Sequence, residues 1–295
     1  MLVTRFAPSP TGYLHLGSAY AALFAHDVAR AQNGRFLLRI EDIDATRCRA
    51  QFDAAICDDL RWLGLDWDGP VWRQSERLAT YHAAIRRLDE LGLVYPCFCS
   101  RKDIAREVAQ SLSAPHGPDG PLYPGTCRSL PRAQTTARMG REPYALRLDV
   151  QQAVARMGTL EFDEHGRGPL GEHGRITAEP ARLGDIVLAS RDRAASYHLA
   201  VVVDDAAQSV SLVTRACDLF ASAHVQRLLQ ALLDLPVPAY SHHDLVLDPE
   251  GRKFSKRDHA ATLRDLRRQG YAPDEIRQRL RLRASGGLAR LGLGT

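Results

Sequence analysis

The sequence predicts an α/β fold built on a doubly wound parallel sheet. Two short apolar segments, residues 2–6 and 35–40, have the composition of strands, and each leads into a helical segment. Strands that alternate with helices favour a parallel sheet with helices on both faces. The 295 residues are 45% hydrophobic and 25% charged, which is typical of a globular protein with one large domain or two smaller ones.

The first part of the chain holds the first half of this sheet. Apolar residues at helical spacing predict helices over residues 19–31, 48–63 and 76–91. The rhythm then breaks at a group of cysteines and two loops rich in Gly and Pro, 114–125 and 165–175. We interpret this region as an insertion in the sheet domain.

The sheet is expected to resume after the insertion. Residues 186–189 are apolar, and 199–203 (LAVVV) form a continuous apolar run typical of a strand buried on both faces, which Asp204 and Asp205 would end. Another short strand is expected at 212–214, before a helix at 221–233. The predicted organisation is 1–96 and 183–240 for the two halves of the sheet domain, 97–182 for the inserted subdomain and 241–295 for a short helical C-terminal region.

Residues 5–18, R-F-A-P-S-P-T-G-Y-L-H-L-G-S, form the most informative motif. They lead from the first expected strand through a turn into a helix, whose N-terminus offers free N–H groups and a positive dipole end to phosphate. Gly17 lets an anion approach the backbone closely, and His15 can donate to a phosphate oxygen as charge builds. A single His in a loop is more often a solvated side chain, so the motif alone leaves both interpretations open.

A second motif, G-R-K-F-S-K-R, covers residues 251–257. Lys253 and Lys256 lie on either side of Ser255, and two ammonium groups can neutralise charge on a departing pyrophosphate. Alone, it would be interpreted as an ordinary basic loop. From 251 to 283 the chain has eleven Lys and Arg against four Asp and Glu, which suits contact with an RNA backbone but also occurs on solvated helices.

Together the two motifs resemble the signatures of class I aminoacyl-tRNA synthetases. H-L-G-S stands where that class has H-I-G-H, and K-F-S-K-R stands where it has K-M-S-K-S. The N-terminal motif and L-R-I-E-D-I-D-A-T-R at 38–47 resemble the glutamyl/glutaminyl branch, and the resemblance covers nearly the whole chain in one order. It implies a Rossmann-like catalytic domain whose ATP-binding and catalytic residues are His15, Gly17, Ser18, Lys253, Ser255 and Lys256.

A pocket for glutamate needs cations for the side-chain carboxylate and an anion or ring for the amine. Arginine suits a carboxylate because its planar fork makes two hydrogen bonds. The resemblance implies that Arg5 and Arg215 bind the carboxylate and that Glu41 binds the ammonium. The ordinary alternatives are a surface salt bridge for each arginine, an exposed acidic loop for Glu41 and a core position for Tyr197. The implied glutamate-binding residues are Arg5, Phe6, Ala7, Pro8, Ser9, Glu41, Tyr197 and Arg215.

One position departs from the family pattern beside this pocket. The family has R-G-x-D-L where this chain has R-A-C-D-L, so Ala216 replaces a glycine. Alanine would be unfavourable there if the turn needs a positive φ. The shape of this turn is therefore left to the structure.

The cysteines predict a structural zinc site, which prefers four ligands. Cys97, Cys99 and Cys127 offer three thiolates, and the residues alone leave the fourth ligand open between Tyr123 and His116. The resemblance implies Tyr123, because it lies in a Y-x-G-x-C context. The alternative is two buried cysteines and an unrelated third. The other three cysteines have the setting of packing residues, and all six are expected to be reduced in a cytosolic protein.

The C-terminal region is expected to be short, because only 38 residues follow Arg257, too few for an anticodon-binding domain of typical size. This resembles truncated paralogues of the glutamyl branch that transfer glutamate to queuosine in the anticodon of tRNA(Asp). The implied partners are ATP with Mg²⁺, L-glutamate and tRNA(Asp), with Mg²⁺ entering on the ATP. The α-carboxylate of glutamate would attack the α-phosphorus of ATP, and a hydroxyl of the modified nucleoside would then take the glutamyl group from the adenylate.

Three other function classes compete with this interpretation. The nearest is a shortened ligase that charges the 3′ end of a tRNA with glutamate. A nucleotidyltransferase for a small molecule is disfavoured by the K-F-S-K motif, and a non-catalytic, zinc-bearing RNA-binding module is disfavoured by intact His15, Lys256 and Glu41. The chain has no apolar run of about 18 residues and no charged and apolar leader. From these two features we expect a cytoplasmic protein without membrane contact. We also expect a monomer, and the net charge of +4 is only mildly basic.

Overall fold

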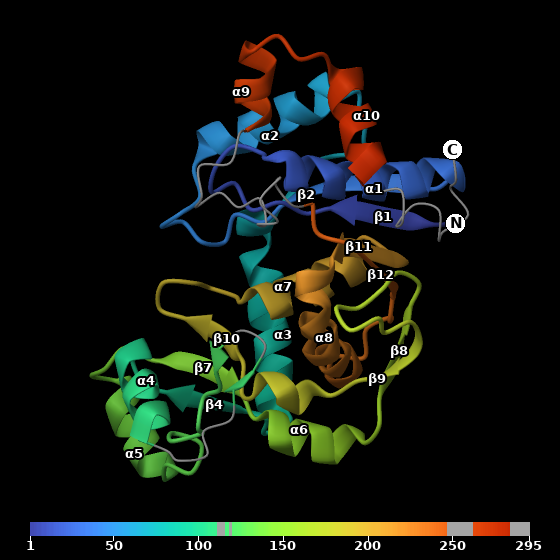
Figure 1. The fold of residues 1–295 in the computed structure, drawn as a ribbon. Coiled ribbons are helices and arrows are strands. Elements are labelled where there is room, and N and C mark those ends of the chain that lie inside the picture. The colour runs from blue at the N-terminus through green and yellow to red at the C-terminus, as the bar shows by residue number, and fades with distance from the viewer. Residues whose placement is uncertain (111–115, 118–119, 247–261, 284–295) are drawn as a thin grey trace.

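Parallel strands form the centre of the fold in the computed structural model (Figure 1). The structure describes residues 1–110, 116–117, 120–246 and 262–283. One group of parallel strands contains β1 (Val3–Phe6), β2 (Arg35–Ile40) and β3 (Trp72–Arg73). The second group contains the parallel strands β11 (Leu212–Ala216), β12 (Ala239–His243) and β8 (Glu161–Glu164), with β9 (Gly174–Thr177) antiparallel at its edge.

The two groups of strands lie edge to edge, with β1 beside β11. The N–H of Ser211 donates to the carbonyl oxygen of Val3 at 3.0 Å, and the N–H of Val3 donates to Ser211 Oγ at 2.9 Å. The chain builds β2 and β3 on one side of β1 and places the later strands on the other. Open α/β sheets bind ligands where the strand order changes direction in this way.

Helices cover both faces of these strands (Figure 1). Phe36 and Leu38 of β2 pack against the helices of one face, while Leu37 faces the other side with Phe220, as the alternation of side chains along a strand requires. This confirms the α/β class with a parallel sheet. The helices are α1 (Leu16–Ala31), α2 (Ala50–Trp62), η1 (Gln74–Arg77), α3 (Leu78–Glu90), α7 (Tyr197–Ala207), η3 (Cys217–Leu219) and α8 (Phe220–Leu232).

The prediction of a strand at 199–203 is wrong, because these residues lie inside α7. Ser196 begins the helix by accepting the N–H of Leu199 at 3.4 Å. A continuous apolar run fits a helix buried on all sides as well as a buried strand, so periodicity does not separate the two. Asp204 and Asp205 do not end the segment. They continue the helix, and both are buried.

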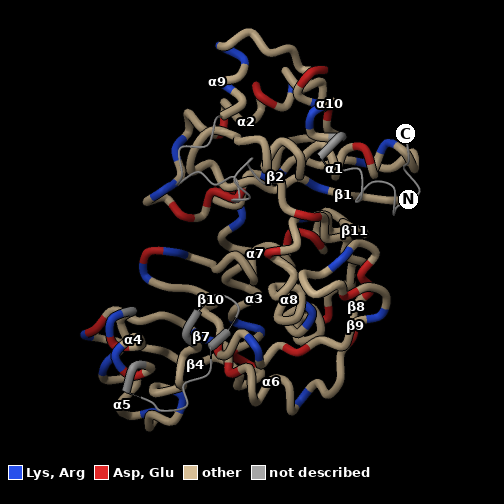
Figure 2. Tube along the Cα trace, viewed as in Figure 1, with Lys and Arg blue, Asp and Glu red and all other residues tan. Residues whose placement is uncertain are grey.

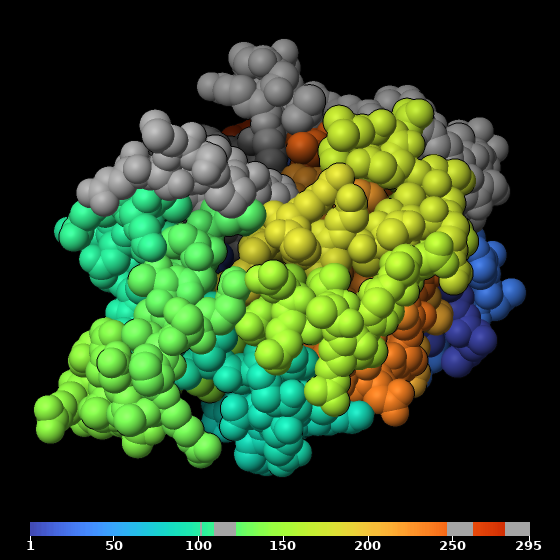
Figure 3. Space-filling model, turned by 90° about the horizontal axis from the view of Figure 1, so that it is seen from below, coloured from blue at the N-terminus to red at the C-terminus, as the bar shows by residue number. Residues whose placement is uncertain are grey.

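A separate antiparallel sheet forms beside the parallel strands. It contains β10 (Val187–Ser190), β7 (Ala145–Leu148) and β4 (Val94–Cys97), in that order. Residues 186–189 were expected to continue the parallel sheet. They do not, because β10 pairs with β7 instead. The accompanying elements are α4 (Arg101–Gln110), β5 (His116–Gly117), β6 (Gly120–Pro121), α5 (Arg132–Met139), α6 (Val150–Met157) and η2 (Pro180–Leu183). Figure 3 shows the green segment around α4 and α5 extending from one side of the molecule.

Two helices after the second motif return to the N-terminal half of the chain. α9 (Leu263–Arg268) and α10 (Pro273–Arg283) bury Leu266 and Ile276 in the same core as α1. Some arginines of this basic region serve that packing, since Arg277 Nη1 donates to the carbonyl oxygen of Leu63 at 3.1 Å. Figure 2 shows acidic segments among the basic ones in both helices. Over the described residues, no helix combines the length and apolarity that crossing a bilayer requires.

Candidate active site

A cavity of about 590 Å³ opens at the carboxyl ends of β1 and β11. This is the place where a parallel sheet offers loop residues and helix N-termini to a ligand. The structure brings to this cavity the sequence-predicted residues that it describes, namely Arg5, Phe6, Ala7, Pro8, Ser9, His15, Gly17, Ser18, Glu41, Tyr197 and Arg215. The predicted residues Lys253, Ser255 and Lys256 lie outside the described residues.

His15 forms the N-cap of α1. Its Nδ1 accepts the N–H of Ser18 at 3.2 Å, and its Nε2 lies 3.1 Å from Ser18 Oγ. The helix therefore begins at Leu16 rather than at residue 19 as expected. This cap places the amino end of α1, with Gly17, at the cavity wall, and a helix N-terminus is a favourable place for a phosphate group.

The described residues on both sides of segment 247–261 lie at or beside this helix start. Val246 lines the cavity. The N–H of Leu263 donates to the carbonyl oxygen of Leu14 at 2.8 Å, and Thr262 pairs with His15 in an isolated bridge. The described residues that flank segment 247–261 thus lie next to the first motif, although they are far from it in sequence.

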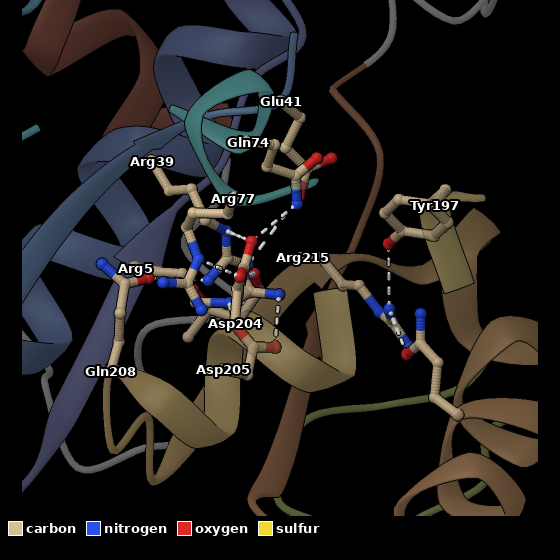
Figure 4. Close-up of polar contacts among 12 residues, drawn as sticks. Arg5, Arg39, Glu41, Gln74, Arg77, Tyr197, Asp204, Asp205, Gln208 and Arg215 are labelled. Atoms are coloured by element: carbon tan, nitrogen blue, oxygen red, sulfur yellow. Dashed lines mark hydrogen bonds and ion pairs between the residues drawn. The ribbon is translucent and has the colours of Figure 1, made fainter. Parts of the chain in front are cut away.

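Arg215 is held at the cavity by neutral acceptors (Figure 4). Its Nη1 donates to Gln226 Oε1 at 2.9 Å and to the hydroxyl of Tyr197 at 3.2 Å, and its Nε donates to His242 Nε2 at 2.9 Å. Its Nη2 is buried and has no hydrogen-bond partner among the described residues. The φ of the neighbouring Ala216 is −71°, so the turn does not need glycine.

Arg5 lies on the same face of the strands but is paired differently. Its Nε and Nη2 donate to the carboxylate of Asp205 at 2.9 and 3.3 Å, and its Nη1 donates to the carbonyl oxygen of Thr214 at 3.2 Å. The guanidinium has five N–H bonds, so one on Nη1 and one on Nη2 remain beyond these contacts. Arg5 is 4% exposed, which rules out the surface salt bridge that the sequence left open.

Two aspartates of α7 hold this part of the site together (Figure 4). Asp205 also accepts Arg39 Nη2 at 2.7 Å. Asp204 accepts hydrogen bonds from Gln74, Arg77 and Tyr81 at 3.0, 2.7 and 2.7 Å. Neither aspartate was expected at the site, because the strand predicted at 199–203 placed both of them at its end. An arginine inside the apolar strand segment F-L-L-R-I was the available signal, since a buried Arg39 requires a buried acid.

Glu41 lines the cavity and has a buried carboxylate oxygen without a hydrogen bond. Its side chain is 9% exposed, and Oε1 has no hydrogen-bond partner among the described residues, with Arg39 Nη2 3.8 Å away. Burial raises the pKa of Glu41 to about 7, although the charges of Arg39 and Arg5 oppose this shift. Glu41 is thus not the exposed acidic loop that was the ordinary alternative, and it can accept a cationic group.

Three thiols form a separate cluster in the inserted region. The Sγ atoms of Cys97, Cys99 and Cys127 all lie within 4.8 Å of one another. The hydroxyl of Tyr123 lies 3.8 Å from Cys99 Sγ and accepts the N–H of Cys127 at 2.8 Å. Tetrahedral zinc–thiolate bonds of about 2.3 Å place sulfur atoms roughly 3.8 Å apart, so one ion fits this set. His116 lies in β5, and its side chain is outside the described residues.

Comparison with known proteins assigns the chain to a family. Residues 1–287 match the family model described as "tRNA synthetases class I (E and Q), catalytic domain". The chain belongs to the class I glutamyl and glutaminyl tRNA synthetases. Members of this synthetase family are ligases, so the resemblance of the two sequence motifs is confirmed at the level of the family.

Several synthetase relatives are similar along nearly the whole chain. A protein of Rhodobacter capsulatus named Glutamyl-Q tRNA(Asp) synthetase is 50% identical over 94% of this chain and 99% of its own length. A protein of the same name from Nocardia farcinica is 47% identical over 92% of this chain and 81% of its own. Glutamate–tRNA ligase 2 of Acidithiobacillus ferrooxidans is 42% identical over 95% of this chain, but this covers only 57% of that protein.

Solved synthetase structures share the fold. The glutamate tRNA ligase of Elizabethkingia meningosepticum superposes with a TM-score of 0.77 over 100% of this chain and 64% of that one, at 24% sequence identity. A methionyl-tRNA synthetase of Mycobacterium tuberculosis superposes with a TM-score of 0.57 at 12% identity. This chain thus spans less than two thirds of the length of either solved synthetase.

Proposed function

We propose that this protein activates L-glutamate with ATP and transfers it to queuosine in the anticodon of tRNA(Asp). The observation that carries this proposal is the cavity at β1 and β11, where two buried cations and one unsatisfied carboxylate oxygen meet the capped start of α1. The relatives named Glutamyl-Q tRNA(Asp) synthetase, which match along nearly the whole chain, support the choice of RNA acceptor.

Each part of glutamate has a complementary group in the cavity. Arg215 Nη2 and the remaining N–H groups of Arg5 would bind the side-chain carboxylate, and Glu41 Oε1 would accept the ammonium. The hydroxyl of Tyr197 accepts from Arg215 Nη1, so its own hydrogen would be left to donate at the edge of this pocket. The backbone from Phe6 to Ser9 would form the wall between the amino acid and the phosphates.

The activation step would use charge stabilisation and alignment rather than covalent catalysis. The α-carboxylate of glutamate attacks the α-phosphorus of ATP, the bond to the β,γ-phosphates breaks, and glutamyl-adenylate and pyrophosphate form. His15 and the amino end of α1, with Gly17 and Ser18, would stabilise the phosphate charge. Lys253 and Lys256, with Ser255 between them, would neutralise the departing pyrophosphate, whose Mg²⁺ enters with ATP.

The three-thiol cluster would hold one structural zinc ion. Cys97, Cys99 and Cys127 supply thiolates, and Tyr123 supplies an oxygen as the fourth ligand. Zinc would replace a hydrophobic core as the element that stabilises this small region, because the described residues around it bury few apolar side chains. It would lie away from the glutamate cavity and take no part in activation.

One experiment tests the proposed reaction. The protein is incubated with ATP and labelled glutamate, together with tRNA(Asp) that carries queuosine, tRNA(Asp) that lacks it, or unmodified tRNA(Glu). Label is expected on the queuosine-containing tRNA(Asp) alone. tRNA that lacks its 3′-terminal adenosine serves as the control, because it has lost the 3′ acceptor hydroxyls but keeps the anticodon. Label on unmodified tRNA(Glu), lost when that adenosine is removed, would identify the protein as a shortened ligase that charges a tRNA 3′ end.

A further inference from the structure

Three polar side chains, beginning with Arg215 at the cavity, form a row across three adjacent strands. Arg215 of β11 is the register partner of His242 in β12, and Glu164 ends the next strand, β8. Arg215 Nε lies 2.9 Å from His242 Nε2, and His242 Nδ1 lies 2.6 Å from Glu164 Oε2. The row therefore links the cavity to the far strand of the sheet.

Burial and hydrogen bonding determine where the proton of His242 lies. Glu164 is 0% and His242 2% exposed. Glu164 Oε1 accepts the N–H groups of His242 and Gly166 at 2.9 and 2.8 Å, so this carboxylate acts as an acceptor throughout. Because an ionised carboxylate can only accept, the imidazole must carry its hydrogen on Nδ1. Its Nε2 is then a lone-pair acceptor for the N–H of Arg215.

The surroundings keep His242 neutral. Burial lowers the pKa of His242 to about 4, and the charge of Arg215 acts in the same direction, whereas the hydrogen bond with Glu164 opposes it. Burial also disfavours ionisation of Glu164, but its hydrogen bonds from His242 and Gly166 lower its pKa overall. The ring of Tyr240 stacks on His242 at 6.0 Å, which restricts the orientation of the imidazole.

We propose that Glu164 and His242 are positioning residues that hold Arg215 for the side-chain carboxylate of the substrate. This deepens the proposed function and rests on it. His242 occupies Nε of Arg215, while Gln226 and Tyr197 occupy Nη1, so that Nη2 is the group left for a ligand.

The contrast with Arg5 explains why a neutral acceptor is used. Asp205 pairs directly with Arg5, so much of that positive charge is compensated inside the protein. Arg215 is held by an imidazole, an amide and a hydroxyl, and among the described residues no carboxylate forms an ion pair with it. Its charge therefore remains available to a carboxylate ligand. Glu164, the acid of the row, contacts His242 and not Arg215 itself. This arrangement selects an anionic side chain over its neutral amide.

Glu164→Gln tests the proposal because it nearly preserves the shape of the side chain but changes which ring nitrogen of His242 carries the hydrogen. The amide oxygen must still accept the N–H groups of His242 and Gly166, so its NH₂ group faces His242 Nδ1. The imidazole must then carry its hydrogen on Nε2, where it opposes the N–H of Arg215. In serine proteases, replacing the catalytic-triad aspartate by asparagine likewise keeps the geometry but sets the wrong tautomer of the histidine.

The expected result in glutamate-dependent ATP–pyrophosphate exchange is a KM for glutamate raised about 10- to 100-fold, as for a lost hydrogen bond to a charged group. The KM for ATP should change by less than about twofold. His242→Phe, which removes both bonds, should match Glu164→Gln. His242→Gln, whose amide can accept from Arg215 and donate to Glu164, should restore the KM for glutamate to within about fivefold of the wild type. ¹⁵N NMR of the histidines should show hydrogen on Nδ1 of His242 in the wild type and on Nε2 in Glu164→Gln.

A wild-type KM for glutamate in Glu164→Gln, or equal losses for glutamate and ATP, would overturn the positioning role. So would a wild-type His242 that carries its hydrogen on Nε2. A wild-type protein without any glutamate-dependent exchange would instead refute the proposed function, and the NMR result would still report on the row. Thermal melting of each variant separates loss of folding from loss of positioning. If Glu164→Gln does not fold, the contrast between His242→Phe and His242→Gln decides, and equal KM values for glutamate in these two variants would overturn the positioning role.

Discussion

Acidification is expected to weaken glutamate use through Glu41. Burial raises the pKa of Glu41 to about 7, against the opposing charges of Arg39 and Arg5. An ammonium group binds the carboxylate form, so the apparent affinity follows the ionised fraction of Glu41. For an acid with a pKa of about 7, that fraction is about 0.1 at pH 6, about 0.5 at pH 7 and about 0.9 at pH 8. The kcat/KM for glutamate should therefore rise about tenfold from pH 6 to pH 8.

The assay is ATP–pyrophosphate exchange at saturating ATP, with glutamate varied at each pH. The carboxylates and the amine of free glutamate do not titrate appreciably between pH 6 and 8, so the slope reports on the protein. Glu41→Gln should lose most activity, and what remains should be flat over this range, because an amide does not ionise. The kcat/KM for ATP is measured in parallel to separate Glu41 from His15, which lies on the phosphate side of the cavity. A flat wild-type profile, or a tenfold rise that persists in Glu41→Gln, would refute the reasoning.

Three further results are expected. Arg215→Ala removes two charge-assisted hydrogen bonds to the substrate and should raise the KM for glutamate about 10²- to 10⁴-fold, with the KM for ATP within about twofold; exchange with unchanged glutamate dependence contradicts this. Asp205→Ala leaves two buried guanidinium groups without their carboxylate and should lower the free energy of unfolding by about 3–5 kcal/mol in denaturant titrations; a loss below about 1 kcal/mol contradicts the network. The purified protein should contain one zinc per chain, Cys127→Ser should reduce that content and the control Cys48→Ser should not; elemental analysis that finds no zinc rules out the site.

Local patterns predicted one strand and two helices of the first half of the chain well. The strand expected at 35–40 is β2, and the helices expected at 48–63 and 76–91 are α2 and α3 within two residues at each end. Here apolar spacing and neighbouring polar residues agree, so local preference and tertiary packing point to the same structure. The start of α1 was missed by three residues because His15, an unusual N-cap, begins the helix.

Segments buried on all sides were predicted less well. Residues 199–203 have no polar alternation, and only packing against α3 and α8 decides that they form a helix. Residues 186–189 do form a strand, β10, but the partner strand is chosen by the chain path through the insertion. A one-dimensional pattern contains neither the partner nor the surroundings of a segment, so both errors concern long-range structure.

The sequence by itself determined the strand–turn–helix that carries the first motif and the types of charged residue that a glutamate site needs. The tertiary structure decided how those charges are used. Asp205 lies 200 residues from Arg5 in sequence and yet takes up most of its fork, while Arg215 keeps Nη2 for a ligand because its neighbours are neutral. Such pairings depend on how α7, α8 and β12 pack against β1 and β11, and local residue preferences do not specify that packing.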